Sequence, residues 1–497
     1  MITDASETSV LAANGRYMPA PAPYLLVYHM NPPKSSLSTG SDLILSKGSD
    51  LGLSKGSDPV IVDGRRGLLY NTDRQRIVAR GQKTARPMRT GTDMKQRNSK
   101  QDKNPIKRSH GIAFRLIRGL SFIYTRLFLG YRCRDKYKIK KGERVLVLSN
   151  HQTDADPFCI LPAFNKPVYP VATDNIFAGK FRSKLFSALG VIPKKKGVVD
   201  LRSTLKIANV LKHGGSALLF IEGNRYYAEF QYFISPTIAP FIKKTGATLV
   251  LFNMRGGSGV SPRFKRSNRR GPFSGAIRRV ITPEEYAEMD NDTLLKEIID
   301  NLRVYDSDSG NTYKSRHRAE YLERALFACP VCGGLETLSS QKQFINCSRC
   351  GLKVEYGEDL HLHSDDPRFK FDRMIDWWNY QKQTIREMPV EPGKVIFQDD
   401  NAKLFYSEPF TARVLLAKGH VEIDDRRIAC EGKEFPLDKI SSASVVSGRN
   451  LTFVYDGTDY TIRGDERFNP LKYIFLFNRL DTLMRVKATD KYFNLEV

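Results

Sequence analysis

A short polar stretch behind a buried-type strand constrains this chain most. Residues 144–149 (RVLVLS) are apolar and β-branched enough for a central strand, and the polar run Asn150–Asp156 follows directly. Asp156-Pro157 has the pattern of a helix N-cap followed by proline at the first helical position. A strand that passes through a turn into a helix predicts an open α/β sheet. His151 would then lie at the carboxyl end of the strand, where such sheets place their ligand sites.

The histidine and the carboxylates of this stretch are candidates for proton transfer. A carboxylate that fixes the tautomer of a histidine makes the ring a useful general base. Asp156 is the expected partner of His151, and Asp154 is a rival that spacing alone does not exclude. The structural alternative is that Asp156 only caps its helix and that His151 is a solvated loop residue.

A second strand with a polar end favours the catalytic interpretation. Residues 216–221 (SALLFI) predict another buried strand, and the turn 222–225 (EGNR) follows it. Glycine permits a tight turn, and arginine at a strand end offers a planar fork for phosphate or carboxylate. Further strands are expected at 166–172 and 276–281, and a helix at 200–213. This alternation predicts an α/β domain with a mainly parallel sheet flanked by helices.

The two turns resemble the first and third motifs of the glycerolipid acyltransferase family, typified by lysophosphatidic acid acyltransferases. The first motif, N-H-x4-D, is matched by Asn150, His151 and Asp156. The third motif, F-P-E-G-T-R, is matched by Phe220, Glu222, Gly223 and Arg225, with Ile221 and Asn224 in place of proline and threonine. Residues 190–196 (GVIPKKK) fit the second motif, and the strand 247–252 lacks the proline of the fourth. The resemblance covers residues 106–310.

The resemblance implies transfer of a fatty acyl group from a thioester, acyl-CoA or acyl carrier protein, to the hydroxyl of lysophosphatidic acid, which gives phosphatidic acid. It implies that His151 is the general base and that Asp156 orients it. The substrate contacts that it implies are Asn150, Lys194, Lys195, Glu222, Gly223 and Arg225. Two alternatives stay open. In the first, the acceptor is a different lipid or a small molecule. In the second, the chain is a non-catalytic membrane adaptor that keeps an acyltransferase fold without the activity.

The net charge of +25 predicts an anionic partner, either a membrane surface or nucleic acid. Residues 112–131 favour the membrane, because they are rich in Phe, Leu and Ile while Arg115, Arg118 and Arg126 cluster in one sector of a helix. This pattern indicates an interfacial helix rather than a spanning one, and the basic residues before it add attraction to anionic lipids. We therefore expect a peripheral protein on the cytoplasmic face of a membrane, with no nucleic acid partner. The alternative is an ordinary core-packing helix.

Four cysteines predict a metal site. Cys329, Cys332, Cys347 and Cys350 form the pattern C-x2-C-x14-C-x2-C. Each pair can form a tight knuckle, and four thiolates complete a tetrahedral site with no open position. The pattern resembles a zinc ribbon with structural zinc. The three isolated cysteines argue against disulfide pairing, His361 and His363 are expected at the surface, and Trp377-Trp378 are expected to pack against the ribbon.

Short strands predominate after residue 394, and a helix is expected from Pro470 to Val486. Several antiparallel strands closed by one helix resemble a pleckstrin-homology-like barrel. The expected strands are 394–398, 412–416, 420–423, 427–430, 444–446, 451–455 and 460–463. At the other end, the repeats LSTGSDLI, LSKGSDLG and LSKGSDPV cannot bury a core, which predicts disorder. We also hypothesise that translation begins at Met94, directly before the basic stretch.

The expected organisation therefore has five regions. They are a low-complexity N-terminal region at 1–93, a basic and amphipathic membrane-interface segment at 94–131, an acyltransferase domain at 132–310, a helical linker with the zinc ribbon at 311–390, and a β-rich pleckstrin-homology-like domain at 394–497.

Overall fold

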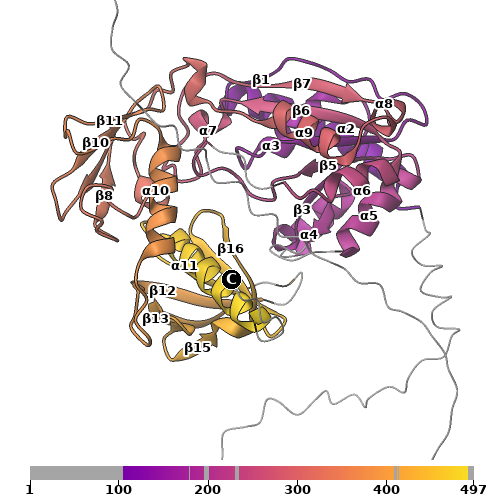
Figure 1. Ribbon diagram of the computed structural model, residues 1–497. Helices are drawn as coiled ribbons and strands as arrows, with labels where there is room; N and C mark the ends of the chain where they lie inside the picture. Colours follow the sequence, from indigo (N-terminus) through magenta and orange to yellow (C-terminus); the bar gives the residue numbers. More distant parts are fainter. Residues whose placement is uncertain are drawn as a thin grey trace, which may run out of the picture. The chain divides into compact units, whose positions relative to one another are not determined.

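The computed structural model describes residues 104–177, 180–194, 201–229, 234–407, 411 and 413–490. All of them belong to one compact unit of the chain, Pro87–Val497. Along this unit the chain forms an α/β part, a small β part and a β-rich part that ends in a helix (Figure 1). This succession confirms the fold class predicted from the sequence. The predictions for residues 1–93, including the translation start, and for the basic residues up to Lys103 lie outside the described residues.

The α/β part is built on one seven-stranded sheet, in the order β1-β7-β6-β2-β5-β3-β4. Its strands are β1 (Tyr131–Cys133), β2 (Val145–Ser149), β3 (Val168–Thr173), β4 (Ile192–Lys194), β5 (Ser216–Phe220), β6 (Thr248–Arg255) and β7 (Phe273–Ile281). Neighbouring strands are parallel except β6 and β7, which form an antiparallel pair. The mainly parallel sheet predicted from strand and helix alternation is thus confirmed.

Helices cover both faces of this sheet (Figure 1). They are α2 (Arg108–Phe128), α3 (Asp156–Ile160), α4 (Lys180–Ala188), α5 (Leu201–Lys212), α6 (Ile238–Thr245), α7 (Gly257–Val260), α8 (Pro283–Ala287) and α9 (Asn291–Leu302). Successive side chains of a strand point to opposite faces. Leu146 and Leu148 accordingly share a core with α5, α6 and α9, whereas Val145 and Val147 share one with α2 and α3. Strand β2 is therefore buried on both sides, as its uninterrupted apolar run predicts.

The prediction that Asp156 caps its own helix is wrong in detail. Ala155 precedes the first helical residue, and Asp156 is itself that residue. Its carboxylate points back into the preceding turn, where it accepts N–H donors from Gln152 and Thr153 at 2.7 and 2.9 Å. A carboxylate in the first helical turn still interacts favourably with the helix dipole. The consequence is that Asp156 shapes the turn that holds His151.

The small β part is a four-stranded antiparallel sheet followed by one helix. Its elements are β8 (Leu338–Gln341), β9 (Phe344–Cys347), β10 (Lys353–Tyr356), β11 (Leu362–His363) and α10 (Met374–Glu387). Strands β8 and β9 form the hairpin expected between the two cysteine pairs. Trp377 of α10 donates its indole N–H to the Ala328 carbonyl at 2.7 Å, so it packs beside the first pair. Trp378 instead stacks on Tyr227 of the α/β part.

The β-rich part is a seven-stranded antiparallel sheet in the order β15-β14-β13-β12-β18-β17-β16. Its elements are β12 (Phe397–Ser407), β13 (Val414–Ile423), β14 (Arg427–Cys430), β15 (Lys433–Pro436), β16 (Ile440–Val446), β17 (Asn450–Tyr455), β18 (Thr458–Arg463) and α11 (Pro470–Asp490). The β-rich pattern closed by a helix is confirmed.

Three strand assignments in this part are wrong. The expected strand 394–398 continues to Ser407, because Asp399–Ala402 forms a bulge rather than a turn. The expected strands 412–416 and 420–423 are one strand, β13, in which Gly419 pairs with Ala402 instead of ending the strand. Strand β15 was not predicted. Acidic and glycine residues resemble turn signals in a sequence, and pairing with a neighbouring strand overrides that local preference.

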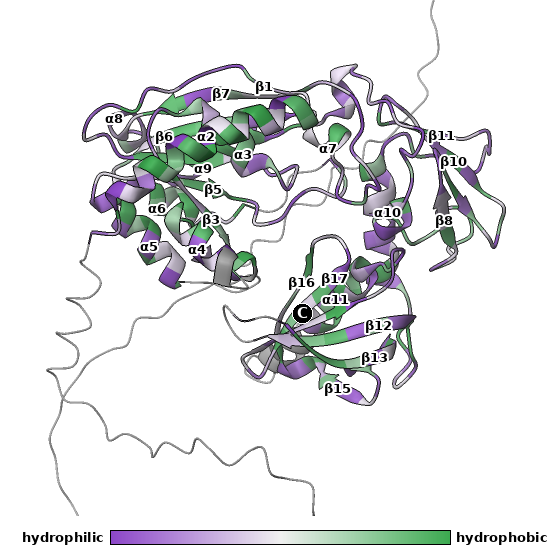
Figure 2. Cartoon of the chain, turned by 180° about the vertical axis from the view of Figure 1, so that it is seen from behind, coloured by the Kyte–Doolittle hydropathy of each residue, from purple (hydrophilic) through white to green (hydrophobic). Residues whose placement is uncertain are grey.

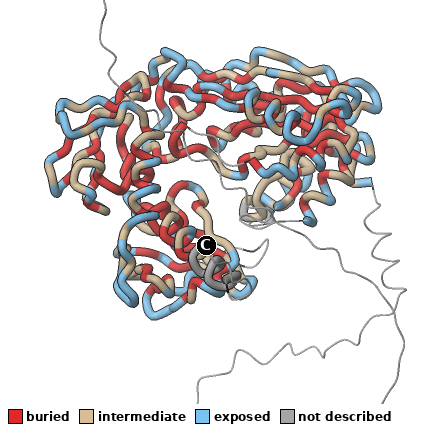
Figure 3. Tube along the Cα trace, in the orientation of Figure 1, coloured by how far each residue is buried: buried red, intermediate tan, exposed pale blue. Residues whose placement is uncertain are grey.

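Buried residues run through all three parts of the described chain (red in Figure 3). One apolar cluster contains Phe114 of α2, Trp377 of α10 and Leu480 of α11. Polar contacts accompany it, because Arg263 of the α/β part donates to the Val445 carbonyl at 2.8 Å. The parts are therefore joined by a shared core rather than by a linker alone.

Candidate active site

The register of the parallel sheet brings the two predicted motifs together. Ser149 at the end of β2 pairs with Phe220 at the end of β5. The turns that follow, Asn150–Ala155 and Ile221–Arg225, therefore leave the same edge of the sheet side by side. Tyr226 donates its backbone N–H to the His151 carbonyl at 3.2 Å, which ties the turns to each other. Open α/β sheets bind ligands at this edge.

His151 and Asp156 form a hydrogen-bonded pair. The distance from His151 Nδ1 to Asp156 Oδ2 is 2.8 Å, and the Asp156 side chain is fully buried. Asp156 also accepts the Thr153 hydroxyl at 2.5 Å, in addition to two backbone N–H groups. An ionised carboxylate only accepts hydrogen bonds, so Nδ1 carries the proton. Nε2 is then the unprotonated nitrogen, which is the tautomer that a general base requires.

The imidazole is also held by packing. Its ring stacks on Phe220 with 4.2 Å between the ring centroids and 22° between the planes. The His151 side chain is 21% exposed and lines a cavity of about 1530 Å³. The ring is thus fixed by a carboxylate at one nitrogen and an aromatic face, with access to a cavity large enough for more than one substrate.

The rival carboxylate, Asp154, has a different partner. Its Oδ2 lies 3.1 Å from Arg225 Nη1, so it forms an ion pair across the two turns. The Arg225 side chain is only 10% exposed and lines the same cavity as His151. Burial lowers the pKa of Arg225, and the charge of Asp154 opposes that effect. The structure therefore assigns Asp156 to the histidine and Asp154 to the arginine.

The third-motif turn is narrow. Gly223 has a positive φ of 67° and lines the cavity, which explains why glycine stands there. Glu222 is buried and accepts the Tyr226 hydroxyl at 2.8 Å. That bond shows Glu222 bracing the turn from within. Tyr226 was not among the predicted site residues, since a tyrosine after the motif carries no signal by itself.

Asn150 joins β2 to β6. Its Nδ2 donates to the Met254 carbonyl and its Oδ1 accepts the Met254 N–H, both at 2.8 Å. Asn150 is fully buried, and its amide spans the two central strands below the histidine. Its contacts thus support the turn, and a direct substrate contact stays a prediction.

Of the two lysines predicted to contact the substrate, the structure describes only Lys194. Lys194 ends β4, is exposed and lines the cavity. Lys195 lies outside the described residues. The basic stretch at 263–270 is partly internal. Arg269 is buried and donates to the Arg318 carbonyl, and Arg263 lies over the Tyr227 ring at 4.1 Å.

A buried polar network behind the turn that holds His151 was not predicted. Gln152, next to His151, donates to Asp306 Oδ2 at 3.0 Å, and Asp306 also accepts the Gly256 N–H at 2.7 Å. Glu229 accepts the Ser307 N–H at 2.9 Å. Burial, together with the Asp306 charge, raises the pKa of Glu229 to about 7. No single motif contains all of these residues, because Gln152, Glu229 and Asp306 come from segments far apart in the sequence.

Comparison with known proteins gave one family match and several similar solved structures. A family model described as Acyltransferase matches residues 130–253, which contain both turns and the His151–Asp156 pair. This chain carries an acyltransferase domain. The solved structures similar to the chain include the 1-acyl-sn-glycerophosphate (LPA) acyltransferase PlsC from Thermotoga maritima. That similarity has 16% sequence identity and a TM-score of 0.34, and covers 38% of this chain and 76% of the other. No curated protein matches the chain.

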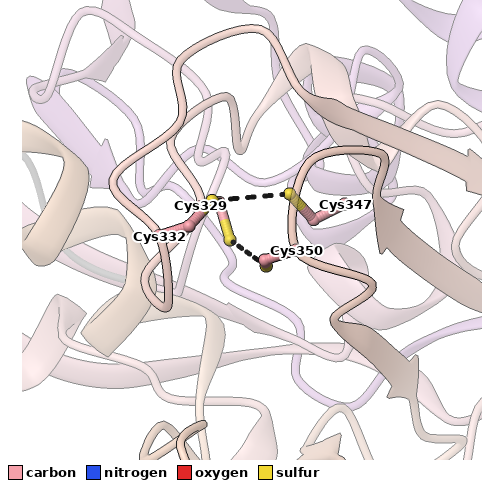
Figure 4. Close-up of side chains that lie close together, drawn as sticks. All are labelled: Cys329, Cys332, Cys347 and Cys350. Carbon is pink, nitrogen blue, oxygen red and sulfur yellow. Dashed lines mark hydrogen bonds between the residues drawn. The ribbon is translucent and has the colours of Figure 1, made fainter.

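Beyond the acyltransferase domain, the four predicted cysteines gather into one cluster. Figure 4 shows the Cys329, Cys332, Cys347 and Cys350 side chains pointing toward one another. Their sulfur atoms lie within 4.8 Å of one another, with 3.6 Å between Cys329 and Cys350 and 3.7 Å between Cys332 and Cys347. A tetrahedron with Zn–S bonds of about 2.3 Å has edges of roughly 3.8 Å. The donor set and spacing therefore fit a tetrahedral metal site. In the described chain no other group of this kind occurs.

The two nearby histidines are not part of this cluster. His361 pairs with Asp372 at 2.8 Å and His363 with Asp359 at 3.3 Å. Four thiolates already fill a tetrahedral site, so a bound metal would have no open position for catalysis.

Proposed function

We propose that this acyltransferase moves a fatty acyl group from a thioester to the hydroxyl of lysophosphatidic acid, and so makes phosphatidic acid. The observation that carries the proposal is the His151–Asp156 pair on the wall of a cavity that Arg225 also lines. The pair supplies a base, and the arginine supplies a cationic contact for a phosphate.

The chemistry follows from the tautomer of His151. Nε2 accepts the proton of the acceptor hydroxyl as its oxygen attacks the thioester carbonyl carbon. The new C–O bond forms, the C–S bond breaks, and the imidazolium returns the proton to the departing thiolate sulfur. Asp156 stabilises the transient imidazolium without leaving its hydrogen bonds in the turn. A positioned base of this kind contributes about 10²- to 10⁴-fold in rate.

The acceptor phosphate would lie between Arg225 and Lys194, which both line the cavity. Arg225 is held in place by Asp154, so its guanidinium is oriented before the substrate binds. Glu222 and Gly223 would shape the turn beside the glycerol. Apolar residues of the same cavity, among them Ile207 and Phe241, would receive the acyl chain.

Helix α2 supports action at a membrane surface. Its protein-facing side contains His110, Phe114, Ser121 and Thr125, whereas many hydrophobic residues lie along its outward side (green in Figure 2). The exposed apolar residues are Ile112, Leu116, Leu120, Phe122, Ile123, Tyr124, Leu127 and Phe128. An apolar face of this extent, turned outward, is typical of a helix that lies in the lipid interface. Arg115 and Arg126 stay exposed and would contact anionic head groups.

Among the described helices, none has the length and hydropathy needed to cross a bilayer. We propose a peripheral protein at the cytoplasmic face of a membrane, with α2 as its contact. We also propose that the four-cysteine site holds structural zinc, and that acyl-CoA or acyl carrier protein supplies the acyl group.

The test is thioester-dependent acylation of lysophosphatidic acid by purified protein on anionic liposomes, with wild type beside His151→Ala. The matched control is His363→Ala, which removes a half-exposed histidine outside the cavity. Activity in wild type and the control that is lost in His151→Ala supports the proposal. Equal activity in all three removes His151 from the mechanism. Activity with other acceptors but not with lysophosphatidic acid would show that the acceptor is a different molecule. If neither acyl-CoA nor acyl carrier protein supports activity, the alternative of a non-catalytic membrane adaptor is favoured.

A further inference from the structure

The cavity that contains His151 is walled in part by the β-rich C-terminal part of the chain. Arg413 directly before β13, Asn450 at the start of β17 and Arg463 at the end of β18 all line it. These residues lie far beyond the third motif in the sequence, outside the segment that matches the acyltransferase family.

Two of these residues are cationic. Burial, and after it the charge of Arg463, lower the pKa of Arg413, and both side chains line the cavity. Among the described residues no ion pair is found for either guanidinium, and the carboxylate of Asp459 lines the same cavity. Arg449, another residue of this wall, differs because its charge acts on Glu466. Two guanidinium groups on one cavity wall, neither of them held in an ion pair among the described residues, favour a bound anion.

A third residue points to the same ligand. Asn450 is 7% exposed, and its buried Oδ1 has no hydrogen-bond partner among the described residues. A buried acceptor without a donor is costly, so such an atom indicates a missing partner. Asn450 pairs with Arg463 across strands β17 and β18, which places the acceptor beside Arg463. An N–H or O–H group on the molecule that carries the anion would satisfy this acceptor.

We propose that the C-terminal β-rich part completes the substrate site, with Arg413 and Arg463 binding a phosphate ester and Asn450 accepting an N–H or O–H group beside it. This inference rests on the proposed acyl transfer and names a second anionic subsite within it. Arg225 and Lys194 stand on the acyltransferase wall, so the two phosphate contacts belong to different walls of one cavity. Both the thioester donor and a phosphorylated acceptor bring phosphate esters next to hydroxyl or amide groups.

The experiment compares wild type with the double variant Arg413→Gln, Arg463→Gln and with Asn450→Ala. The control is Lys433→Gln, which removes an exposed charge from β15 at the opposite edge of the same sheet. Steady-state kinetics are measured with two donors, acyl-CoA and S-acyl pantetheine without phosphate. Two acceptors are also used, lysophosphatidic acid and monoacylglycerol. Circular dichroism melting verifies that each variant folds.

The expected result is a rise of about 10- to 100-fold in one KM with kcat nearly unchanged, because uniform binding is lost. A rise in KM for acyl-CoA but not for S-acyl pantetheine shows that the two arginines bind the phosphates of the donor. A rise in KM for lysophosphatidic acid but not for monoacylglycerol shows that they bind the phosphate of the acceptor. KM values equal to those of Lys433→Gln for every substrate overturn the proposal.

A calorimetric titration separates this inference from the proposed function. If wild type shows no turnover, coenzyme A and lysophosphatidic acid are titrated into wild type and the double variant. Binding to wild type that is lost in the double variant supports the subsite even though the proposed reaction has failed. Equal binding to both proteins, or no binding to wild type, overturns the subsite.

Discussion

Asp154 Oδ2 lies 3.1 Å from Arg225 Nη1, and this ion pair joins the turn after β2 to the turn after β5. The carboxylate is mostly exposed, whereas the guanidinium is buried at the cavity wall. Because Asp154 is engaged with Arg225, His151 is left with Asp156 as its carboxylate partner. The two acidic residues of the first motif region therefore have separate tasks.

Asp154→Asn should weaken acceptor binding and leave the chemical step intact. The substitution removes the charge that orients Arg225, so we expect KM for the acceptor to rise about 3- to 10-fold with kcat within twofold. Steady-state kinetics on mixed micelles measure both constants. A collapse of kcat with KM unchanged would show instead that Asp154 serves the histidine.

Asp156→Asn should abolish most of the activity. An amide cannot replace the carboxylate that fixes the His151 tautomer, so kcat should fall by about 10²- to 10⁴-fold. The same residue holds the Gln152 and Thr153 N–H groups, so thermal unfolding must be measured in parallel. A folded variant with wild-type kcat would exclude the tautomer argument.

Replacing outward residues of α2 should release the protein from lipid. Leu116→Gln with Leu127→Gln removes two exposed leucines, and vesicle binding should fall about tenfold or more, because each buried leucine contributes about 1.5–3 kcal/mol. Co-sedimentation with anionic vesicles measures the effect. Leu205→Gln on α5, also an exposed leucine, is the control and should bind like wild type. Unchanged binding of the double variant would place the lipid contact elsewhere.

Glu229 should make the folded protein less stable as pH rises. Its pKa is about 7 in the folded state, raised by burial from 4.5, so the folded state holds the proton more tightly than the unfolded state. Stability therefore falls between about pH 4.5 and 7, by on the order of 3 kcal/mol in total from this group.

Glu229→Gln removes that ionisation, so the stability of the variant should depend less on pH than that of wild type. Denaturant unfolding at pH 5 and pH 8 measures the free energy of unfolding. The variant is expected to be more stable than wild type at pH 8. The exposed Glu288→Gln serves as the control and should follow wild type at both values. A Glu229→Gln variant with the same loss between pH 5 and pH 8 as wild type would contradict the assignment.

Metal analysis should find one zinc per chain, and Cys347→Ser should lose it. The cluster lies beside Trp377 in the shared core, so removal of the metal should lower the unfolding midpoint by about 5 °C or more. A strong chelator should act in the same way on wild type. Wild type without metal and with an unchanged midpoint would exclude structural zinc.

The local patterns in the sequence were enough for the parts of this protein that depend on neighbours along the chain. The buried run at 144–149 predicted β2, and the two C-x2-C pairs predicted the cysteine cluster. Spacing also placed His151 and Asp156 together, because five residues of one turn cannot separate far. Strand ends in the β-rich part were predicted less well, since bulges and pairing depend on partners from other strands.

Only the tertiary structure decided which groups meet across the chain. Asp154 and Asp156 follow His151 by three and five residues, and spacing alone does not choose between them. The choice depends on Arg225, which parallel pairing of β2 and β5 brings near. Likewise, nothing in residues 413–463 indicates that Arg413, Asn450 and Arg463 line the cavity of His151. Contacts between residues hundreds of positions apart arise from the packing of whole elements, and periodicity along a single segment carries no information about that packing.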